Sequence, residues 1–487
     1  MAEKMRSMEV EVEEAREYFN NGNTKDMPWR RSQLKGLRRF VKEQEEAIFR
    51  AVNQDLGKHQ VEAYRDEIGT VIKSLDIALS SLKSWISKKK AALPVVAFPS
   101  TAYLVPEPLG LVLVISSWNY PFGLALEPLI GALAAGNTVV LKPSELSPTC
   151  SSVLASILPN YIDKNAVKVI QGGADVAQKL LDIKWDKILF TGSPNVARTV
   201  MAAAAKHLTP VILELGGKCP AVIDNISCSV DRKVAVKRVL AAKFGACGGQ
   251  ACIAVDYILV EKKNAEKLVD LLKKCTKKMF GENPQDTNSM ARIVNKQHFF
   301  RLKNLIDDPK VISTIVHGGS SDENSLFIEP TILLDPPLDS AIMTDEIFGP
   351  LLPIITLEKI EDSIRFINAR PKPLAVYVFS NNSKLKKNIV SNTSSGSVAI
   401  NDAMIQYVAD TIPFGGVGGS GFGRYHGKFS FEAFSHEKGV LQRGFFGDIW
   451  FRFPPWNAHK LRLFKSGYAF DYLGMALVVL RLKKTHK

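Results

Sequence analysis

Short apolar runs alternate with longer stretches along most of the chain beyond residue 110, and this alternation narrows the fold more than any other feature. The first runs occupy residues 111–115, 138–141, 166–170 and 187–190. A second series begins near Val211 and includes residues 220–223, 257–260, 353–357 and 374–379. The stretches between the runs are long enough for helices, which favours parallel strands joined by helical crossovers. Because such sheets bind nucleotides at the carboxyl ends of their strands, the pattern predicts an α/β nucleotide-binding protein.

The segment before these runs has helical periodicity over residues 8–90. Its apolar residues recur at steps that place them on one stripe, as in Leu34, Leu37, Val41, Ile48 and Val52. We expect this stripe to pack on a sheet. The length of 487 residues exceeds the roughly 250–300 at which single cores stop growing, so at least two domains are expected.

The charge and the cysteines restrict the class of function. The net charge is +14, but the 63 Lys and Arg are interleaved with 49 acids, and no aromatic-basic binding motif is present. We therefore expect anionic cofactors or membrane surfaces as partners, and no nucleic acid. The 6 cysteines lack the C-x-x-C spacing of metal sites, so reduced thiols and no metal are expected. Neither a secretory apolar region nor an acid-poor transit peptide opens the sequence, which favours the cytoplasm.

Two short motifs offer the chemistry of covalent catalysis. Cys252 ends the run Gly249-Gln250-Ala251-Cys252, and Glu214 opens residues 214–218. A thiolate adds to a carbonyl carbon, and a carboxylate activates the water that later releases the product. The competing interpretations are a buried inert cysteine and a capping or salt-bridged glutamate. Cys247 is interpreted as a small core residue, with a role as oxidation partner as the alternative.

Several further short runs occur in a fixed order around these motifs. The ordered runs are residues 117–121, 142–145, 190–193, 214–218, 249–252 and 346–350. This series resembles the ordered signatures of the aldehyde dehydrogenase superfamily. Residues 413–418, 423–428 and 434–436 are similar to class 3, the group containing fatty aldehyde dehydrogenases and their plant relatives. The resemblance covers residues 10–460.

The resemblance implies a role for each reacting residue. Cys252 would be the nucleophile, and Glu214 would deprotonate the water that hydrolyses the resulting thioester. Asn119 follows the run 111–115 and should therefore lie at the carboxyl end of a strand. Its amide and the Cys252 backbone N–H would stabilise the tetrahedral alkoxide, by typically about 3 kcal/mol for each donor. Lys218 is interpreted as structural.

The resemblance also implies NAD as cofactor, with NADP as a second possibility. The diphosphate is expected at the loop and helix that start at Gly192 and Ser193, where N–H groups attract negative charge. Lys142 and Glu145 would face the adenosine ribose. A carboxylate there accepts hydrogen bonds from the ribose and repels a 2′-phosphate, so Glu145 favours NAD, although class 3 members often accept both cofactors.

The remaining cofactor contacts are expected from other loops. Glu346 would hold the nicotinamide ribose with Phe348 beside it, and Trp118 and Leu215 complete the predicted cofactor-binding residues. The only literal G-x-G-x-x-G, residues 416–421, follows Pro413-Phe414 rather than a strand, so we do not assign it to the cofactor.

By the same resemblance, two Rossmann-like domains and a bridging segment are expected. Residues 1–80 and 106–210 would form the NAD-binding domain, residues 211–395 the catalytic domain, and residues 81–105 and 396–450 the bridge to the partner subunit of a homodimer. Three positions depart from the family pattern: Ala197 replaces a glycine, Gly248 an asparagine and Gly419 a glutamate. They lie near the cofactor or the nucleophile and bear on activity and cofactor affinity.

The predicted activity is NAD(P)-dependent oxidation of medium or long aliphatic or aromatic aldehydes to carboxylic acids, as in aldehyde detoxification. A cofactor-independent thiol esterase and a non-catalytic, membrane-associated scaffold are the alternatives. The tail, residues 451–487, contains an apolar stretch over 468–480 followed by Arg481, Lys483, Lys484 and Lys487. This stretch falls short of the roughly 20 residues that span a bilayer. It fits a helix lying on the endoplasmic reticulum or another membrane, a gate over the active-site mouth, or a contact with the partner subunit.

Overall fold

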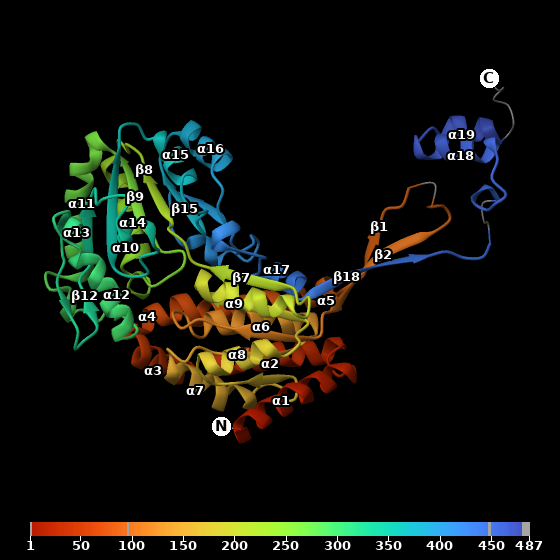
Figure 1. Cartoon of the computed structure of the whole chain (residues 1–487), viewed down its shortest axis with the longest axis horizontal. Helices are drawn as coiled ribbons and strands as arrows, with labels where there is room; N and C mark the ends of the chain where they lie inside the picture. The colour runs from red at the N-terminus through yellow and green to blue at the C-terminus, as the bar shows by residue number, and fades with distance from the viewer. Residues whose placement is uncertain (1, 95–96, 447–449, 480–487) are drawn as a thin grey trace. The chain divides into compact units, whose positions relative to one another are not determined.

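The structure, a computed structural model, describes residues 2–94, 97–446 and 450–479, and the chain forms two compact units (Figure 1). The first unit consists of Met1–Trp85 and Pro108–Ser435, and the second of Ile86–Glu107 and His436–Lys487. Two mainly parallel sheets with helical crossovers form most of the first unit, so the predicted α/β class is confirmed.

A six-stranded sheet contains the first series of apolar runs. Its strand order is β17-β7-β6-β3-β4-β5, and all neighbours are parallel except β17, which is antiparallel to β7. The strands are β3 (Leu111–Ile115), β4 (Thr138–Lys142), β5 (Val167–Val169), β6 (Lys187–Gly192), β7 (Val211–Leu215) and β17 (Gly421–Phe422). Every residue of β3 and β4 is buried, which explains why these strands are continuous apolar runs without alternation.

The strand order reverses direction at β3. From β3 the chain proceeds to β4 and β5 on one side, and then returns to add β6 and β7 on the other side. In open parallel sheets a crevice forms outside the carboxyl ends of the strands at such a reversal. The loops that follow β3 and β6 are therefore placed together at one edge of the sheet.

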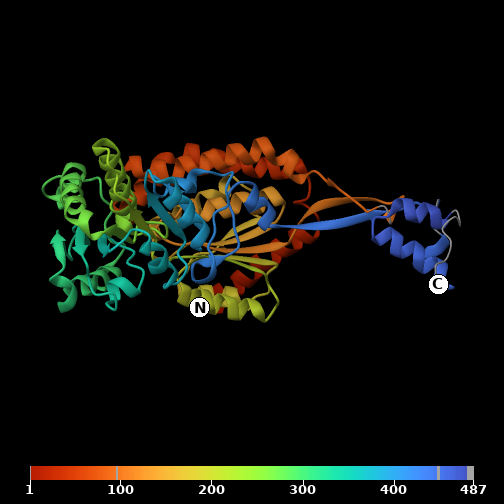
Figure 2. The same cartoon turned by 90° about the horizontal axis from the view of Figure 1, so that it is seen from above.

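Helices cover both faces of this sheet (Figure 1, Figure 2). The crossover helices are α6 (Gly123–Ala135), α7 (Pro148–Ser156), α8 (Ala174–Asp182) and α9 (Pro194–Ala205). The N-terminal elements are α1 (Ala2–Asn20), α2 (Met27–Glu43), α3 (Glu45–Leu56), α4 (Gln60–Ala63), the π-helix η1 (Tyr64–Ile68) and α5 (Gly69–Ile86). The predicted apolar stripe on α2 and α3 is buried, but it packs on α6 and α7, whereas α1 packs on the strands.

A seven-stranded sheet contains the second series, in the order β10-β13-β14-β9-β8-β15-β16. Its strands are β8 (Pro220–Ile223), β9 (Tyr257–Glu261), β10 (Ile315–His317), β13 (Thr331–Leu334), β14 (Leu351–Leu357), β15 (Ala375–Phe379) and β16 (Ser397–Ile400). The helices around it are α10 (Ser229–Lys243), α11 (Lys262–Phe280), α12 (Lys296–Asp307), α13 (Pro309–Ile312), α14 (Ala341–Thr344), α15 (Asp362–Asn368) and α16 (Ser383–Asn392). A two-stranded sheet, β11 (Ser321–Asp322) and β12 (Phe327–Ile328), and helix α17 (Lys428–Ala433) complete the first unit.

Two segments belong to sheets that differ from those predicted from the sequence. Residues 211–215 were expected to open the second series, but as β7 they pair with β6 in the six-stranded sheet, so the seven-stranded sheet begins at β8. Residues 397–400 were expected in the bridging segment, but as β16 they pair with β15. In both cases pairing partners distant in sequence, rather than local periodicity, select the sheet.

In its described part, the second unit contains a three-stranded sheet and the α-helices α18 (Ala458–Tyr468) and α19 (Tyr472–Val479). The strands β1 (Lys89–Ala91), β2 (Thr101–Pro108) and β18 (Ser435–Gln442) lie in the order β1-β2-β18, with ion pairs Lys89–Glu437 at 2.9 Å and Lys438–Glu107 at 2.8 Å. Helices α18 and α19 pack on each other. The basic end of the predicted tail, residues 481–487, lies outside the described residues.

No helix within residues 2–94, 97–446 and 450–479 combines the length and apolar character needed to cross a bilayer.

Candidate active site

A cavity of about 870 Å³ lies where the strand order reverses. It is lined by residues from the loops after β3, β6 and β7, from the turn before β9, and from the loop before β14. Most residues predicted from the sequence line it, namely Trp118, Asn119, Gly192, Ser193, Glu214, Cys252, Glu346 and Phe348. Among the described residues, Lys142, Glu145 and Leu215 do not contribute to this lining.

The turn that carries Cys252 depends on left-handed backbone. Cys247, Gly248 and Gly249 have φ angles of 50°, 59° and 81°. A Cβ on Gly249 would collide with the carbonyl oxygen of Gly349, so this position requires glycine. The conformation of Gly248 is one that asparagine also adopts, although a Cβ there would lie 2.9 Å from the Ala291 carbonyl oxygen. The turn thus brings Cys252 to the cavity wall.

The thiol of Cys252 is half-buried and lies near two carboxyl groups. Burial raises its pKa, and the negative charges of Glu346 and Glu214 raise it further. Its own backbone N–H and that of Ile253 donate to the sulfur and act in the opposite direction. The thiol is therefore protonated at rest and needs a proton acceptor inside the cavity before it can react.

Glu214 is the second-last residue of β7, and its side chain is buried in the cavity wall. Both of its carboxylate oxygens are buried without a hydrogen-bond partner among the described residues. Burial raises the pKa of Glu214 well above its ordinary value. A carboxyl group without protein partners is free to accept a proton from water or from a thiol, which favours the predicted base over a capping or salt-bridged glutamate.

The turn behind Glu214 is shaped by Glu346. A Cβ on Gly216 would collide with the carboxyl group of Glu346, so only glycine permits this close approach. Burial and the charge of Asp256 raise the pKa of Glu346 to about 8. Lys218 pairs with Asp256 and also donates to the carbonyl oxygen of Asp345 at 2.8 Å, which supports its predicted structural role.

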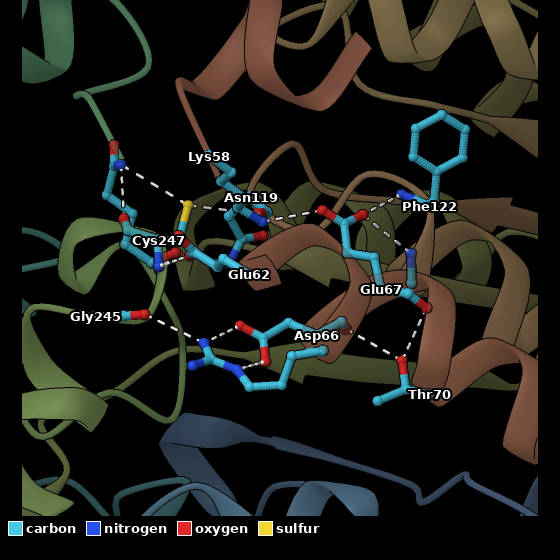
Figure 3. A network of polar contacts seen from close by, with 12 residues as sticks. Lys58, Glu62, Asp66, Glu67, Thr70, Asn119, Phe122, Gly245 and Cys247 are labelled. Atoms are coloured by element: carbon cyan, nitrogen blue, oxygen red, sulfur yellow. Dashed lines mark hydrogen bonds and ion pairs between the residues drawn. The ribbon is translucent and has the colours of Figure 1, made fainter. Parts of the chain in front are cut away.

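Asn119 lies just beyond β3, as predicted, and its side chain is buried. Its Nδ2 donates to the carbonyl oxygen of Gln250 at 2.9 Å, which leaves the second amide hydrogen for a ligand. The backbone carbonyl oxygen of Asn119 accepts from Lys58 Nζ at 2.7 Å and from Cys247 Sγ at 3.5 Å (Figure 3). Cys247 is fully buried, as predicted for a core residue.

The segment at Gly192 and Ser193 has the features of an anion site. Ser193 is the N-cap of α9, and its Oγ accepts from the backbone N–H of Val196 at 3.4 Å. The hydroxyl of Thr191 is buried in the cavity wall without a partner among the described residues. A helix N-terminus and an unpartnered hydroxyl at one wall fit the diphosphate of a dinucleotide.

The other predicted cofactor residues lie in three places. Lys142 and Glu145 form an ion pair of 2.6 Å at the carboxyl end of β4, next to the strand that leads into the cavity. Leu215 packs with its side chain in the core of the six-stranded sheet. Phe348 contacts Trp118 edge to face, with ring centroids 5.5 Å apart, and these two rings form an apolar wall.

Of the positions that depart from the family pattern, Ala197 does not line the described cavity. It is buried in the core of the six-stranded sheet and does not contribute to the described lining, so its methyl group packs against the sheet. Gly419 lines the cavity.

Some residues that shape the cavity were not predicted. His298 and Arg301 both line it, because an i, i+3 spacing places them on one face of α12. Burial lowers the pKa of His298 to about 4. Arg301 donates to the carbonyl oxygen of Ile347 at 2.8 Å and so holds the loop of Glu346. The spacing was visible in the sequence, but nothing there indicated which face of the helix meets the cavity.

Comparisons with known proteins agree with this geometry. The model of the aldehyde dehydrogenase family matches residues 2–440. Aldehyde dehydrogenase family 3 member F1 of Arabidopsis thaliana is 52% identical over 478 residues, covering 98% of this chain and 99% of the relative. The dimeric NADP-preferring aldehyde dehydrogenase of Rattus norvegicus is 44% identical over 458 residues, covering 94% of this chain and 98% of the relative. The solved substrate-bound state of Staphylococcus aureus AldH is 41% identical, covers 95% of this chain and 99% of its own, and superposes with a TM-score of 0.91.

Proposed function

The chain belongs to the aldehyde dehydrogenase family, and we propose that it oxidises aldehydes through Cys252, Glu214 and Asn119. Its relatives are class 3 members, and it is an NAD(P)-dependent aldehyde dehydrogenase of that class. The observation that carries the residue assignment is one cavity lined by all three side chains, although they lie far apart in the sequence.

The first step is addition of the thiolate. Cys252 loses its proton to water in the cavity, and the partnerless carboxylate of Glu214 stays free for the last step. The sulfur then bonds to the aldehyde carbon, and the carbonyl oxygen becomes an alkoxide. Asn119 Nδ2 and the backbone N–H of Cys252 donate to this oxygen, each worth about 3 kcal/mol in comparable sites.

The second step breaks the C–H bond of the adduct. Thr191, Gly192 and Ser193 would hold NAD⁺ or NADP⁺, which would supply the acceptor for the departing hydride. The chain orients the adduct, and collapse of the alkoxide leaves a thioester on Cys252. Phe348 and Trp118 form an apolar wall of this site and limit the access of water.

The last step releases the acid. Glu214 takes a proton from a water molecule as that water attacks the thioester carbon, the C–S bond breaks, and the thiolate of Cys252 is restored. The buried, partnerless carboxyl group supports this role because no competing protein donor has to be displaced.

Replacing the nucleophile tests this assignment. Cys252→Ala should abolish NADH formation from hexanal or nonanal and leave NAD⁺ binding nearly unchanged, because the cofactor wall stays intact. Cys228→Ala, which removes an exposed thiol, is the matched control and should retain full activity. Turnover of Cys252→Ala above about a hundredth of the wild-type rate would contradict the assignment.

Medium or long aliphatic and aromatic aldehydes are the substrates that we propose. Cys252 and Tyr407 both pack against the hydrophobic cluster that contains Phe414 and Tyr425. Phe414 contacts the rings of Tyr407 and Tyr425, with centroid distances of 5.2 Å and 5.6 Å. These aromatic rings near the nucleophile favour apolar substrates over small hydrated ones.

The sequence predicts a division of labour between the two sheets, and β7 lies in the first of them. We propose that the six-stranded sheet, including β7, binds the cofactor and that the seven-stranded sheet and the turn of Cys252 form the catalytic part. The segments 81–105 and 396–450 would contribute to the contact with a partner subunit. The name of the rat relative supports a homodimer.

The second unit exposes large apolar side chains to solvent. Phe445, Phe446 and Leu473 are 108%, 94% and 74% exposed. Helix α18 also exposes Arg462 and Lys465, and aromatic and basic residues together are typical of segments that lie on anionic membranes. We propose a cytoplasmic enzyme of aldehyde detoxification that contacts the endoplasmic reticulum or another membrane through this tail, with substrate gating and docking on the partner subunit as the other roles.

The relatives give no support to the alternatives, a cofactor-independent thiol esterase and a non-catalytic scaffold.

A further inference from the structure

A cluster of buried charges lies behind the cavity, outside its lining. Lys58 follows α3, Glu62 belongs to α4, and Glu67 belongs to the π-helix η1. The side chains of Lys58 and Glu67 are both 0% exposed and form an ion pair of 3.0 Å. Glu62 is also buried. Burying such charges is costly, and replacing them by apolar residues is often neutral or stabilising, so stability alone does not account for them.

The cluster holds the loop that carries Asn119. Lys58 Nζ donates to the Asn119 carbonyl oxygen at 2.7 Å, and Glu67 Oε2 accepts from the backbone N–H of Phe122 at 2.8 Å (Figure 3). The Lys58–Glu67 ion pair therefore binds the backbone on both sides of Tyr120. The centroid of the Tyr120 ring lies 3.9 Å from Lys58 Nζ. These contacts fix the direction in which the Asn119 side chain leaves the loop.

The same cluster also holds the turn that carries Cys252. Glu62 accepts from the backbone N–H of Cys247 at 2.6 Å, where the left-handed turn begins. Cys247 Sγ and Lys58 Nζ both donate to the Asn119 carbonyl oxygen, and Asn119 Nδ2 donates to the Gln250 carbonyl oxygen at 2.9 Å. The two loops are thus joined to one another and to the cluster.

We propose that Lys58, Glu62 and Glu67 form a positioning cluster that sets the spacing between the oxyanion donor Asn119 and the nucleophile Cys252. This inference rests on the proposed function, because it assumes those roles for the two residues. The cluster does not contribute to the described cavity lining, and all three contacts that carry it end on backbone groups, so it acts through the loops and not on the substrate.

The positioning cluster is suited to this task because Lys58 stays charged. Lys58 contacts Glu67, the Asn119 carbonyl oxygen and the Tyr120 ring, and the surrounding carboxylates raise its pKa despite burial. An ammonium group that stays charged keeps all its hydrogens for these contacts.

The test uses the full-length enzyme and the variant Lys58→Met. This substitution removes the donor to Asn119 and should lower kcat with hexanal about a hundredfold, the loss typical of a misplaced oxyanion donor. NAD⁺ affinity should change by less than about twofold, because the cofactor wall is untouched. Lys168→Met, which removes the partly exposed ion pair with Glu14, is the matched control and should keep the wild-type kcat.

A double variant separates positioning from stability. Lys58→Met alone leaves Glu67 as an uncompensated buried charge, which lowers stability. Lys58→Met/Glu67→Gln removes both charges and retains an oxygen that accepts from Phe122. Its melting temperature should recover towards wild type, while kcat stays about a hundredfold low because the backbone carbonyl oxygen of Asn119 still lacks the contact with Lys58. Recovery of kcat together with stability would overturn the proposal.

The Glu62 contact gives an independent measurement. Glu62→Gln retains an acceptor for the Cys247 N–H, so iodoacetamide should alkylate its Cys252 at the wild-type rate. In Glu62→Leu the alkylation of Cys252 should be about tenfold slower or lose its selectivity for Cys252. Equal rates of Cys252 alkylation in the two variants would overturn the role of Glu62 in positioning the turn of Cys252. If wild type itself lacked aldehyde oxidation, or Cys252→Ala retained it, the proposed function would fail instead, so the two failures are distinguishable.

Discussion

Glu214→Gln separates the two halves of the proposed reaction. The carboxylate oxygens of Glu214 have no hydrogen-bond partner among the described residues, so the substitution breaks no protein contact and preserves the shape of the cavity wall. Thiol addition and hydride loss should still occur, whereas hydrolysis of the thioester loses its base. A positioned base typically contributes about 10²–10⁴-fold, so steady-state turnover should fall within that range.

Rapid mixing with NAD⁺ and hexanal measures this separation directly. The variant should form one equivalent of NADH per active site in a fast burst and then stall as the acyl-enzyme, which mass spectrometry of the intact chain should detect on Cys252. Cys252→Ala is the control and should give neither burst nor acyl-enzyme. Absence of a burst, or a normal steady-state rate, would refute the assignment of Glu214 as the deacylating base.

The pH dependence of the steady-state rate is a second test of Glu214. A general base acts only when ionised, and burial raises the pKa of Glu214 well above its ordinary value. The wild-type steady-state rate should therefore fall as the pH decreases through that raised pKa, and Glu214→Gln should lose this dependence. An unchanged acid limb in the variant would assign the dependence to another group.

Three further outcomes are expected. Glu145→Gln weakens the pair with Lys142 and removes the repulsion of a 2′-phosphate, so the ratio of kcat/KM for NADP⁺ over NAD⁺ should rise about tenfold; an unchanged ratio would show that Glu145 does not face the ribose. Gly216→Ala should displace the carboxyl group of Glu346 and lower kcat at least about tenfold without loss of folding by circular dichroism, and wild-type kinetics would contradict the tight approach. Deletion of residues 461–487 should abolish co-sedimentation with anionic vesicles at low salt, whereas equal sedimentation would exclude the tail as a membrane contact and leave gating or docking.

Much of the candidate site could be predicted because its signals are local. The left-handed turn at Gly248 and Gly249 requires glycine for a backbone reason, and the position of Asn119 after an apolar run follows from strand periodicity. The order of strands and helices in the first series was predictable for the same reason. Each of these features is written within a few neighbouring residues.

Sheet membership could not be predicted in this way. Val211–Leu215 and Ser397–Ile400 are apolar runs like their neighbours, and their period does not specify a pairing partner. β7 pairs with β6, and β16 pairs with β15. These pairings depend on hydrogen bonds and burial that exist only in the folded chain. Ala197 shows the same limit, since its place in the core instead of the cavity wall depends on how α9 packs on the sheet.

The sequence by itself determined the α/β class and predicted Cys252, Glu214 and Asn119 as the reacting residues, because period, turn chemistry and motif order are properties of short segments. Only the tertiary structure decided that Lys58 and Glu67 are buried together and hold the loop of Asn119. In sequence these charges resemble the exposed face of a helix, because lysine and glutamate are almost never fully buried unless paired. Their partners are backbone groups far along the chain, and only folding brings such groups within hydrogen-bonding distance.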